Sequence, residues 1–271
     1  HAFFKALLFL GAGSVIHAFH DEQDITKMGG VWKKIPYTMI LMLIGTLALT
    51  GFPFLSGFYS KDAIIEFAYL TNSVTGNYVS SVGILTAFLT AIYSWRLFFK
   101  TFFGDYNNKT IPINKTHESP LIMIIPLIIL AIGALITGYV FKGLLIGNNS
   151  SFWGDSILFL EFVKLENIPL WLILITPVLI LIAIPISYYL FIANKNILEG
   201  VKNSNLPLYK FLLNKWYIDE IYNYIFIEPL KKLGLFFWKK GDLNTIDKYG
   251  PDGISKLIKF ISNKAVQLQS G

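Results

Sequence analysis

The chain has little charge and no cysteine. Asp, Glu, Lys and Arg together make up 15% of its 271 residues, against roughly 25% in a typical soluble domain. Apolar residues make up 54%, and the mean hydropathy is +0.55. These values exclude an ordinary soluble domain and predict an integral membrane protein. The lack of cysteine excludes disulfides and Cys-ligated metal or iron–sulfur centres within this chain.

Motifs for soluble cofactor chemistry are absent as well. The sequence contains no glycine-rich phosphate loop, no nucleophile triad, and no flavin or nicotinamide fingerprint. The run HDEQD, which begins at His20, offers metal-ligand side chains, but no second His/Glu pair at helical spacing follows it. We interpret this run as a solvated loop and expect neither a metal nor a redox cofactor in this chain.

The formal net charge of +6 raises the question of a nucleic-acid partner. The lysines lie mostly in predicted loops and after residue 194, rather than on one folded basic face. A positive cytoplasmic side of a membrane protein explains the same charge. No nucleic acid is therefore expected among the partners.

Apolar runs long enough to cross a bilayer, about 20 residues, recur along the chain. We expect spans at residues 1–19, 37–74, 82–103, 120–141 and 169–194. Pro126, Pro177 and Pro185 should kink their helices without ending them, because neighbouring helices can satisfy the freed carbonyls. The predicted fold is an all-α, polytopic transmembrane helical bundle.

The charges of the connecting segments test this division. Lysine-rich segments lie at 20–36, at 96–118 and after residue 194, whereas the segment 75–81 is uncharged and 142–168 is mainly acidic. The positive-inside rule places the first set in the cytoplasm and the second set on the opposite side. This alternation requires residues 37–74 to cross the membrane only once.

The region from about 206 to 269 has a different pattern. Leu, Ile, Phe and Trp recur at i, i+3 and i+4 against lysines, which is typical of amphipathic helices that lie in the membrane interface or along partner helices. Pro229 and the stretch around Pro251 should divide it into two or three pieces. We expect a transmembrane region at 1–194 and an amphipathic region at 195–271.

Lys61 follows a predicted helix break. Gly51, Pro53 and Gly57 interrupt the apolar run at 37–74. Breaks of this kind place free backbone dipoles and a titratable group at the depth of the bilayer. An ionisable group at that depth is a functional-site hypothesis by default.

Ser60 is expected to cap the half-helix that follows the break. The positive N-terminal dipole would then ease proton loss from Lys61 and keep Asp62 ionised. Glu66 lies four residues after Asp62 and is its expected neighbour. The competing interpretation is a half-helix that ends near the interface, with Lys61 and Asp62 simply in water.

His1 and Lys5 form a second titratable pair. They are four residues apart, so on a helix they share one face, which Phe3 and Phe4 make apolar. Desolvation penalises an ammonium ion, which would let Lys5 exchange protons near neutral pH, as a histidine also does. His17, near the end of the same span, is a candidate for proton entry or exit. The competing interpretation is a snorkelling lysine and a helix-end histidine.

Four motifs resemble one protein family. They are HAFFKALLFLGAGSVIHAFHDEQD, KMGGVWKKIPYT, GTLALTGFPFLSGFYSKDAI and NKWYIDEIYNYIFIEPL. They are similar to the C-terminal part of the subunit L, or chain 5, family of proton-translocating NADH:quinone oxidoreductase, respiratory complex I. Mrp-type Na⁺/H⁺ antiporter subunits share the first motif and the broken helix, whereas KWYIDEIY and the amphipathic tail favour complex I.

The resemblance implies an antiporter-like subunit built from inverted repeats of five helices. In such a subunit Lys5 lies on a central polar axis that connects to Lys61, and His1 and Asp62 belong to the same motifs. The resemblance also implies a long lateral helix within residues 206–269, and a chain that lacks the first repeat and the last spanning helix. NADH, FMN, iron–sulfur clusters and quinone would bind to partner subunits.

The predicted function is therefore that of a proton-translocating membrane-arm subunit of NADH:quinone oxidoreductase. The predicted location is the bacterial inner membrane, with the lysine-rich loops and the tail on the cytoplasmic side. Other membrane-arm subunits and the lipid bilayer would be its partners. Two alternatives stay open: an Mrp-type antiporter subunit without redox coupling, and a structural clamp of the membrane arm in which the lysines are incidental.

Overall fold

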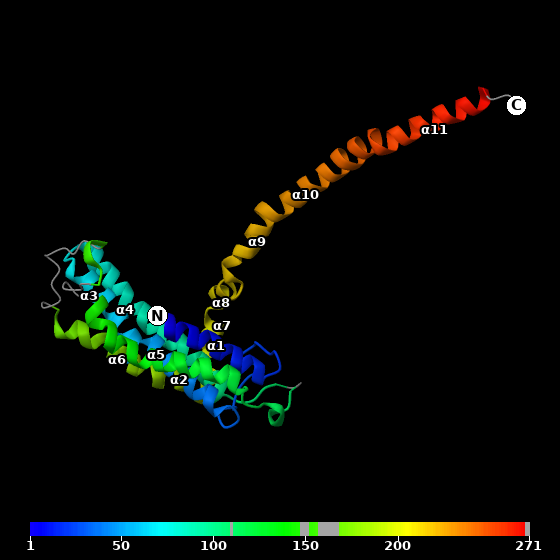
Figure 1. Ribbon diagram of the computed structural model, residues 1–271. Helices are drawn as coiled ribbons and strands as arrows, with labels where there is room; N and C mark the ends of the chain where they lie inside the picture. Colours follow the sequence, from blue (N-terminus) through cyan, green and yellow to red (C-terminus); the bar gives the residue numbers. More distant parts are fainter. Residues whose placement is uncertain (109–110, 147–151, 157–167, 269–271) are drawn as a thin grey trace. The chain divides into compact units, whose positions relative to one another are not determined.

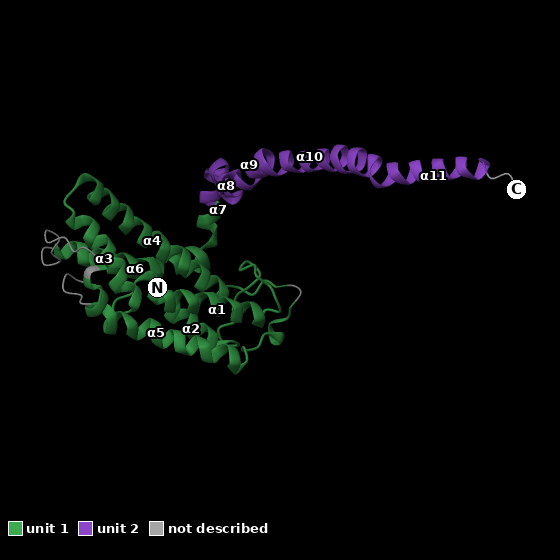
Figure 2. Cartoon of the chain, turned by 45° about the horizontal axis from the view of Figure 1, so that its top comes forward, with its two compact units in different colours: residues 1–199 green, residues 200–271 purple. Residues whose placement is uncertain are grey.

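The computed structural model describes residues 1–108, 111–146, 152–156 and 168–268. These residues form helices and connecting turns, and no strand occurs among them. The chain divides into two compact units, residues 1–199 and 200–271 (Figure 2). The prediction of an all-α protein is confirmed.

The first unit is a bundle of apolar helices (Figure 1). Its helices are α1 (Ala2–Ala18), α2 (Pro36–Thr50), α3 (Ser56–Leu70), α4 (Val74–Phe102), α5 (Leu121–Leu145) and α6 (Leu170–Tyr188), which continues as a π-helical turn (Tyr189–Ala193). Short 3-10 helices lie at Ile113–Lys115 and Gly154–Ser156. Among the described helices, α4, α5 and α6 with its π-helical end are long and apolar enough to cross a membrane.

The predicted uncharged loop at 75–81 is wrong, because α4 already begins at Val74. The turn lies just before it, where Asn72 adopts a φ of 47°. The Ser73 hydroxyl then accepts a hydrogen bond from the Gly76 N–H at 3.0 Å, which caps the new helix. Polar residues in the first turns of α4 dilute its apolar pattern, so this part of the helix resembled a connection in the sequence.

Helices α2 and α3 occupy the middle of the bundle. Helix α5 packs against α1, α2 and α3, while α4 packs against α2 and α3 and also against α6. One cluster of buried side chains, with Leu7 and Leu127, joins α1, α2 and α5, and another, with Trp95 and Ile180, joins α4 and α6 to the rest. The exposed side chains of α4, α5 and α6 are largely apolar, as lipid-facing surfaces require.

The lysine-rich segments meet at one end of the bundle. The Trp32 N–H donates to the last carbonyl of α4 at 3.3 Å, and the Lys195 ammonium pairs with Asp105 at 2.6 Å. At the other end, the rings of Tyr69 and Trp171 join the end of α3 to the start of α6, with centroids 5.7 Å apart. Residues 36–70 therefore cross the bundle once, although which end faces the cytoplasm stays a prediction.

Glu118 caps the start of α2 from a distant part of the chain. Its carboxylate accepts hydrogen bonds from the Tyr37 N–H at 2.8 Å, from the Thr38 N–H at 3.3 Å and from the Thr38 hydroxyl at 2.5 Å. The buried Ser14 hydroxyl bonds Thr38 at 2.8 Å and Ser119 at 2.6 Å. This network ties α1, α2 and the start of α5 together.

The second unit is helical, and its described residues are almost all exposed. Helix α7 (Lys195–Ser204) leads into it, and α8 (Leu206–Leu213), α9 (Ile218–Tyr222), α10 (Glu228–Phe236) and α11 (Pro251–Leu268) follow. π-Helical stretches at Asn223–Ile227 and Phe237–Asp247 continue α9 into α10 and α10 toward α11. In α11 the apolar residues and the lysines lie on different faces, which gives the amphipathic pattern expected from the sequence.

Pro229 does not divide this unit, contrary to the prediction. The Glu228 N–H bonds the Asn223 carbonyl, five residues back, as in a π-helical turn. The helix continues through Pro229, because the N–H that proline lacks is not needed for a helical hydrogen bond after this turn. The division lies instead at Lys215–Tyr217, where three successive residues have φ between 52° and 61°. Helix α11 does begin at Pro251.

Replacing Glu118 by Ala should destabilise the first unit. The change removes the acceptor for two N–H groups of α2 and for a buried hydroxyl, and loss of a helix cap typically costs about 1–2 kcal/mol. Thermal unfolding of the full-length protein in detergent measures the effect. Glu199→Ala in α7 is the matched control, because this exposed carboxylate at the same end of the bundle makes no hydrogen bond to the described residues. Equal unfolding temperatures for the two variants would show that Glu118 is not needed as a cap.

Candidate functional site

Helix α2 ends at a break that spans residues 51–55 and includes Pro53. Gly51 adopts the left-handed conformation, with φ 88° and ψ 35°. Its N–H bonds the Ala48 carbonyl at 3.2 Å, and the Phe52 N–H bonds the Leu47 carbonyl at 3.0 Å. This is the hydrogen-bond pattern by which a glycine ends an α-helix, since a side chain would disfavour that backbone conformation.

The two half-helices approach each other closely at Gly57. A Cβ atom at this position would lie 1.8 Å from the Ala48 carbonyl oxygen, so only glycine fits there. From the neighbouring helix α5, Gly138 faces the backbone of Ser56, and a Cβ atom on it would lie 2.6 Å from the Ser56 Cα. The break is therefore enclosed by helices rather than open on a loop.

The Lys61 amine binds the end of α2. Its Nζ donates to the Leu49 carbonyl at 3.0 Å and to the Thr50 carbonyl at 3.4 Å. The last carbonyls of a helix have no amide partners of their own, and the C-terminal end of the helix dipole attracts a cation. The amine of the second half-helix thus satisfies the open end of the first.

Ser60 does not cap α3, contrary to the prediction. The helix begins four residues earlier, at Ser56, after Leu55 in an extended conformation, and no side chain caps it. The Ser60 hydroxyl instead donates long hydrogen bonds, both 3.4 Å, to the Ser56 and Gly57 carbonyls. Lys61 therefore lies in the second turn of α3, where the N-terminal dipole has fallen off.

Asp62 is buried without a hydrogen-bond partner. Its exposed fraction is 8%, and neither carboxylate oxygen has a partner among the described residues. It forms no ion pair with Lys61, because adjacent residues point to different faces of a helix. Glu66 lies one turn further along, and its charge acts on Asp62. A buried carboxylate bears a large desolvation penalty, which a proton, a cation or water can relieve.

His1 and Lys5 line different cavities. The Lys5 N–H bonds the His1 carbonyl at 3.1 Å, so the two residues are one helical turn apart. The His1 ring, at the N-cap position outside the regular helix, packs on Phe4 with centroids 4.9 Å apart. Lys5 is exposed and lines a separate cavity of about 320 Å³, together with Thr46 and Ser94.

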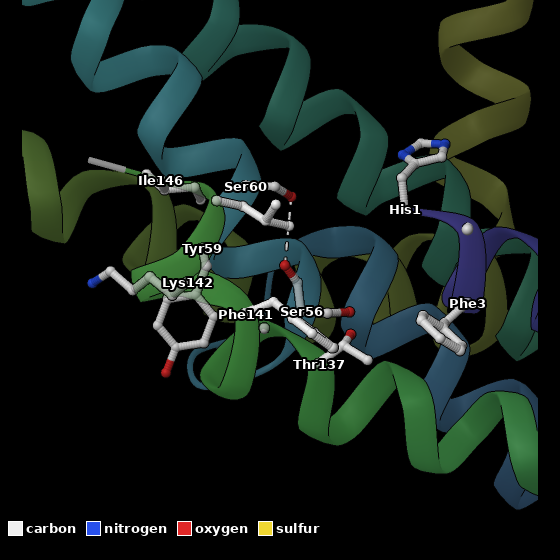
Figure 3. Close-up of a pocket in the computed structure, with 12 residues that line it drawn as sticks. His1, Phe3, Ser56, Tyr59, Ser60, Thr137, Phe141, Lys142 and Ile146 are labelled. Atoms are coloured by element: carbon white, nitrogen blue, oxygen red, sulfur yellow. Dashed lines mark hydrogen bonds between the residues drawn. The ribbon is translucent and has the colours of Figure 1, made fainter. Parts of the chain in front are cut away.

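A second cavity, of about 230 Å³, lies beside the break (Figure 3). The start of α1, the start of α3 and the last turns of α5 enclose it. Its polar lining residues are His1, Ser56, Tyr59, Ser60, Thr137 and Lys142. The Ser56 hydroxyl is buried and has no partner among the described residues. A water needs about 10–15 Å³ of such volume, so the cavity has room for several.

His17 lies at the lysine-rich end of the bundle with two further histidines. The His117 ring is 5.6 Å from the His17 ring and 5.9 Å from the His20 ring, between centroids, and all three residues are exposed. His117 comes from the segment between α4 and α5, and no local signal in the sequence pointed to it. No group of three ligand-type side chains in the described ranges is arranged to hold a metal ion.

The HDEQD segment forms a turn held by its own side chains. Lys27 pairs with Glu22 at 2.8 Å, and Asp24 accepts hydrogen bonds from the Thr26 N–H at 2.9 Å and from the Thr26 hydroxyl at 2.8 Å. The hydrogen bond from Lys27 holds the pKa of Glu22 below its usual range, and the Thr26 N–H does the same for the pKa of Asp24. The structure agrees with the interpretation of this segment as a solvated loop.

The chain is similar to known proteins over its whole length. A family model described as "NADH:quinone oxidoreductase/Mrp antiporter, TM" matches residues 1–92, and one described as "NADH dehydrogenase subunit 5 C-terminus" matches residues 93–271. The chain is 41% identical over 278 residues to the NADH-ubiquinone oxidoreductase chain 5 of Phytophthora infestans, and 38% identical over 279 residues to that of Arabidopsis thaliana. Each alignment covers 100% of this chain but only 42% of the relative.

Gly57→Ala is expected to destabilise the break. The added methyl group would overlap the Ala48 carbonyl oxygen, and forced shifts of this kind cost roughly 1–3 kcal/mol. Thermal unfolding of the full-length protein should therefore start at a lower temperature. Gly143→Ala in α5 is the control, because a Cβ atom there meets nothing within 4 Å. If both variants unfold at the temperature of the unchanged protein, the close approach of α2 and α3 does not contribute to stability.

Proposed function

Because the chain belongs to the NADH dehydrogenase subunit 5 family, we propose that it is part of the proton-translocating membrane arm of an NADH:quinone oxidoreductase. The observation that carries this proposal is the Lys61 amine, bound to the open carbonyl end of α2 and next to the buried Asp62. Electron transfer takes place in partner subunits, which bind NADH, FMN, iron–sulfur clusters and quinone. This chain contributes the proton path.

Lys61 is the group that takes up and releases the proton. As an ammonium ion it donates charge-assisted hydrogen bonds to the Leu49 and Thr50 carbonyls, and as a neutral amine it keeps only weaker ones. A positive charge that arrives nearby favours release of the proton, and a negative charge favours its retention. Charge movements in the membrane arm can in this way drive protons through the site.

The other predicted site residues take supporting roles. Lys5, on its cavity beside Thr46, supplies the proton along a hydrated path, and Asp62 sets the charge next to Lys61. His1 lines the cavity beside the break, and His17 exchanges protons with water at the lysine-rich end.

The protein is a multi-pass membrane protein, and we assign its lysine-rich end to the cytoplasmic side. The bacterial inner membrane remains our sequence-based assignment, while the two compared relatives come from eukaryotes. The amphipathic tail lies along partner subunits of the membrane arm as the lateral helix. Partner subunits and lipid together cover the exposed apolar surfaces.

The alternatives differ in what they explain. An Mrp-type antiporter subunit fits the match over residues 1–92, whose description names both families, but the match over residues 93–271 is to subunit 5. A purely structural clamp explains the amphipathic tail but gives no reason for an amine on the end of α2.

Lys61→Ala should abolish proton pumping while the complex still assembles. Removing a proton-transferring group typically costs at least about 100-fold in the step it serves, so vesicles that contain the variant should acidify far more slowly per NADH oxidised. Lys33→Ala is the control, because this ammonium lies over the Trp32 ring, 5.0 Å from its centroid, at the lysine-rich end. Unchanged pumping, or a complex that no longer assembles, would favour the structural clamp.

A further inference from the structure

A row of charged side chains continues from the break along α3 to α5. Asp62 and Glu66 are one turn apart and interact through their charges, and the charge of Lys142 acts in turn on Glu66. The Lys142 ammonium also lies over the ring of Tyr59, 5.2 Å from its centroid. Four charged groups, from Lys61 to Lys142, therefore interact as successive neighbours.

This row leads away from the lysine-rich end of the bundle. Glu66 lies in the last turns of α3, close to Tyr69, whose ring packs against Trp171 at the opposite end. Lys142 lies in the last turn of α5. The row thus extends from the break to the far end of the membrane-spanning unit.

The cavity in Figure 3 extends from the break to Lys142, the member of the row that lines it. Ser56 lines it at the break, and Lys142 and Tyr59 line it further along. Ser56 is 8% exposed, and its buried hydroxyl has no partner in the described part of the chain, which makes it costly in an apolar environment. Water here can carry a proton between the break and the far end.

Glu66 and Lys142 make no direct hydrogen bond or ion pair with each other. Within the described ranges, the Glu66 carboxylate accepts no hydrogen bond. It also forms no ion pair there, whereas Glu22 and Asp105 at the lysine-rich end each pair with a lysine. A fixed brace between α3 and α5 would need such a contact. A carboxylate that is attracted to a cation but not bound by it keeps its oxygens available for a proton.

We propose that Glu66 is the outlet group of the proton path and that Lys142 is its positioning residue, an inference that rests on the proposed function of Lys61. An N–H bond of the Lys61 ammonium breaks, water carries the proton, and an O–H bond forms on the Glu66 carboxylate. The products are a neutral amine and a carboxylic acid. Glu66 then gives the proton to water at the far end, and the Lys142 ammonium favours this release because it stabilises the carboxylate. No electron moves in these steps.

Glu66→Gln in the full-length protein, within the assembled complex, tests the outlet. Gln keeps the size of the side chain but cannot bind a proton, so proton pumping per NADH oxidised should fall about 100-fold. Pumping is normalised to the amount of assembled complex. Glu66→Asp keeps a carboxyl group and should recover most of the pumping. Glu22→Gln is the control, because this carboxylate lies in the turn at the lysine-rich end and pairs with Lys27.

Two experiments test the role of Lys142: substitutions that remove or keep its charge, and a double variant that combines Lys142→Gln with Glu66→Gln. Lys142→Gln should lower pumping less than Glu66→Gln does, and Lys142→Arg, which keeps the charge, should pump normally. If Lys142 acts through Glu66, the double variant should pump no worse than Glu66→Gln alone. Additive losses would overturn the assignment of Lys142.

The outcomes separate this inference from the function on which it rests. Normal pumping in Glu66→Gln, beside lost pumping in Lys61→Ala, overturns the outlet and leaves the proposed function standing. Normal pumping in both variants overturns the proposed function and the outlet together. Lost pumping in Glu66→Gln that Glu66→Asp does not restore identifies Glu66 as structural and also overturns the outlet.

Discussion

The hydrogen bonds from the Lys61 amine to the last carbonyls of α2 are the interaction on which the geometry of the break depends. A helix that ends within a bilayer leaves carbonyl groups without amide partners, and the lipid offers none. Here the second half-helix supplies the donor. Gly57 lets α3 approach α2 closely, and that approach lets Lys61 reach Leu49. The glycines and the lysine are therefore parts of one arrangement.

Buried polar groups in an apolar bundle need hydrogen-bond partners, and this requirement divides the polar groups of the first unit into two sets. The hydroxyls of Thr46 and Thr50 bond carbonyls of their own helix, at 2.7 Å and 2.9 Å, and Glu118 caps the start of α2. Asp62 and Ser56 are equally buried but unpartnered. In an apolar bundle such groups are costly, so their presence beside the break supports a functional role for them over a purely structural one.

The sequence predicted the features that depend on local composition, and it missed those that depend on distant residues. The long apolar runs predicted the helices of the bundle, the break marked Lys61 and the spacing from His1 marked Lys5 as candidate proton-exchanging groups. The family resemblance added the polar axis that connects the two lysines. Ser60 looked like a cap because serine favours that position, but the turn at the break starts the helix at Ser56. Glu118 and His117 meet α2 and α1 only in the folded chain, so no nearby signal could reveal them.

The protonation state of Lys61 also affects how firmly α2 and α3 are joined. The ammonium belongs to α3 and its acceptors belong to α2, so protonation strengthens the joint between the half-helices. Under the proposed function, linkage then works in both directions: separating the carbonyls from the amine favours proton loss from Lys61, and proton loss weakens the contact between the two half-helices. In the proposed function the break would therefore couple the displacement of α3 against α2 to the charge of Lys61.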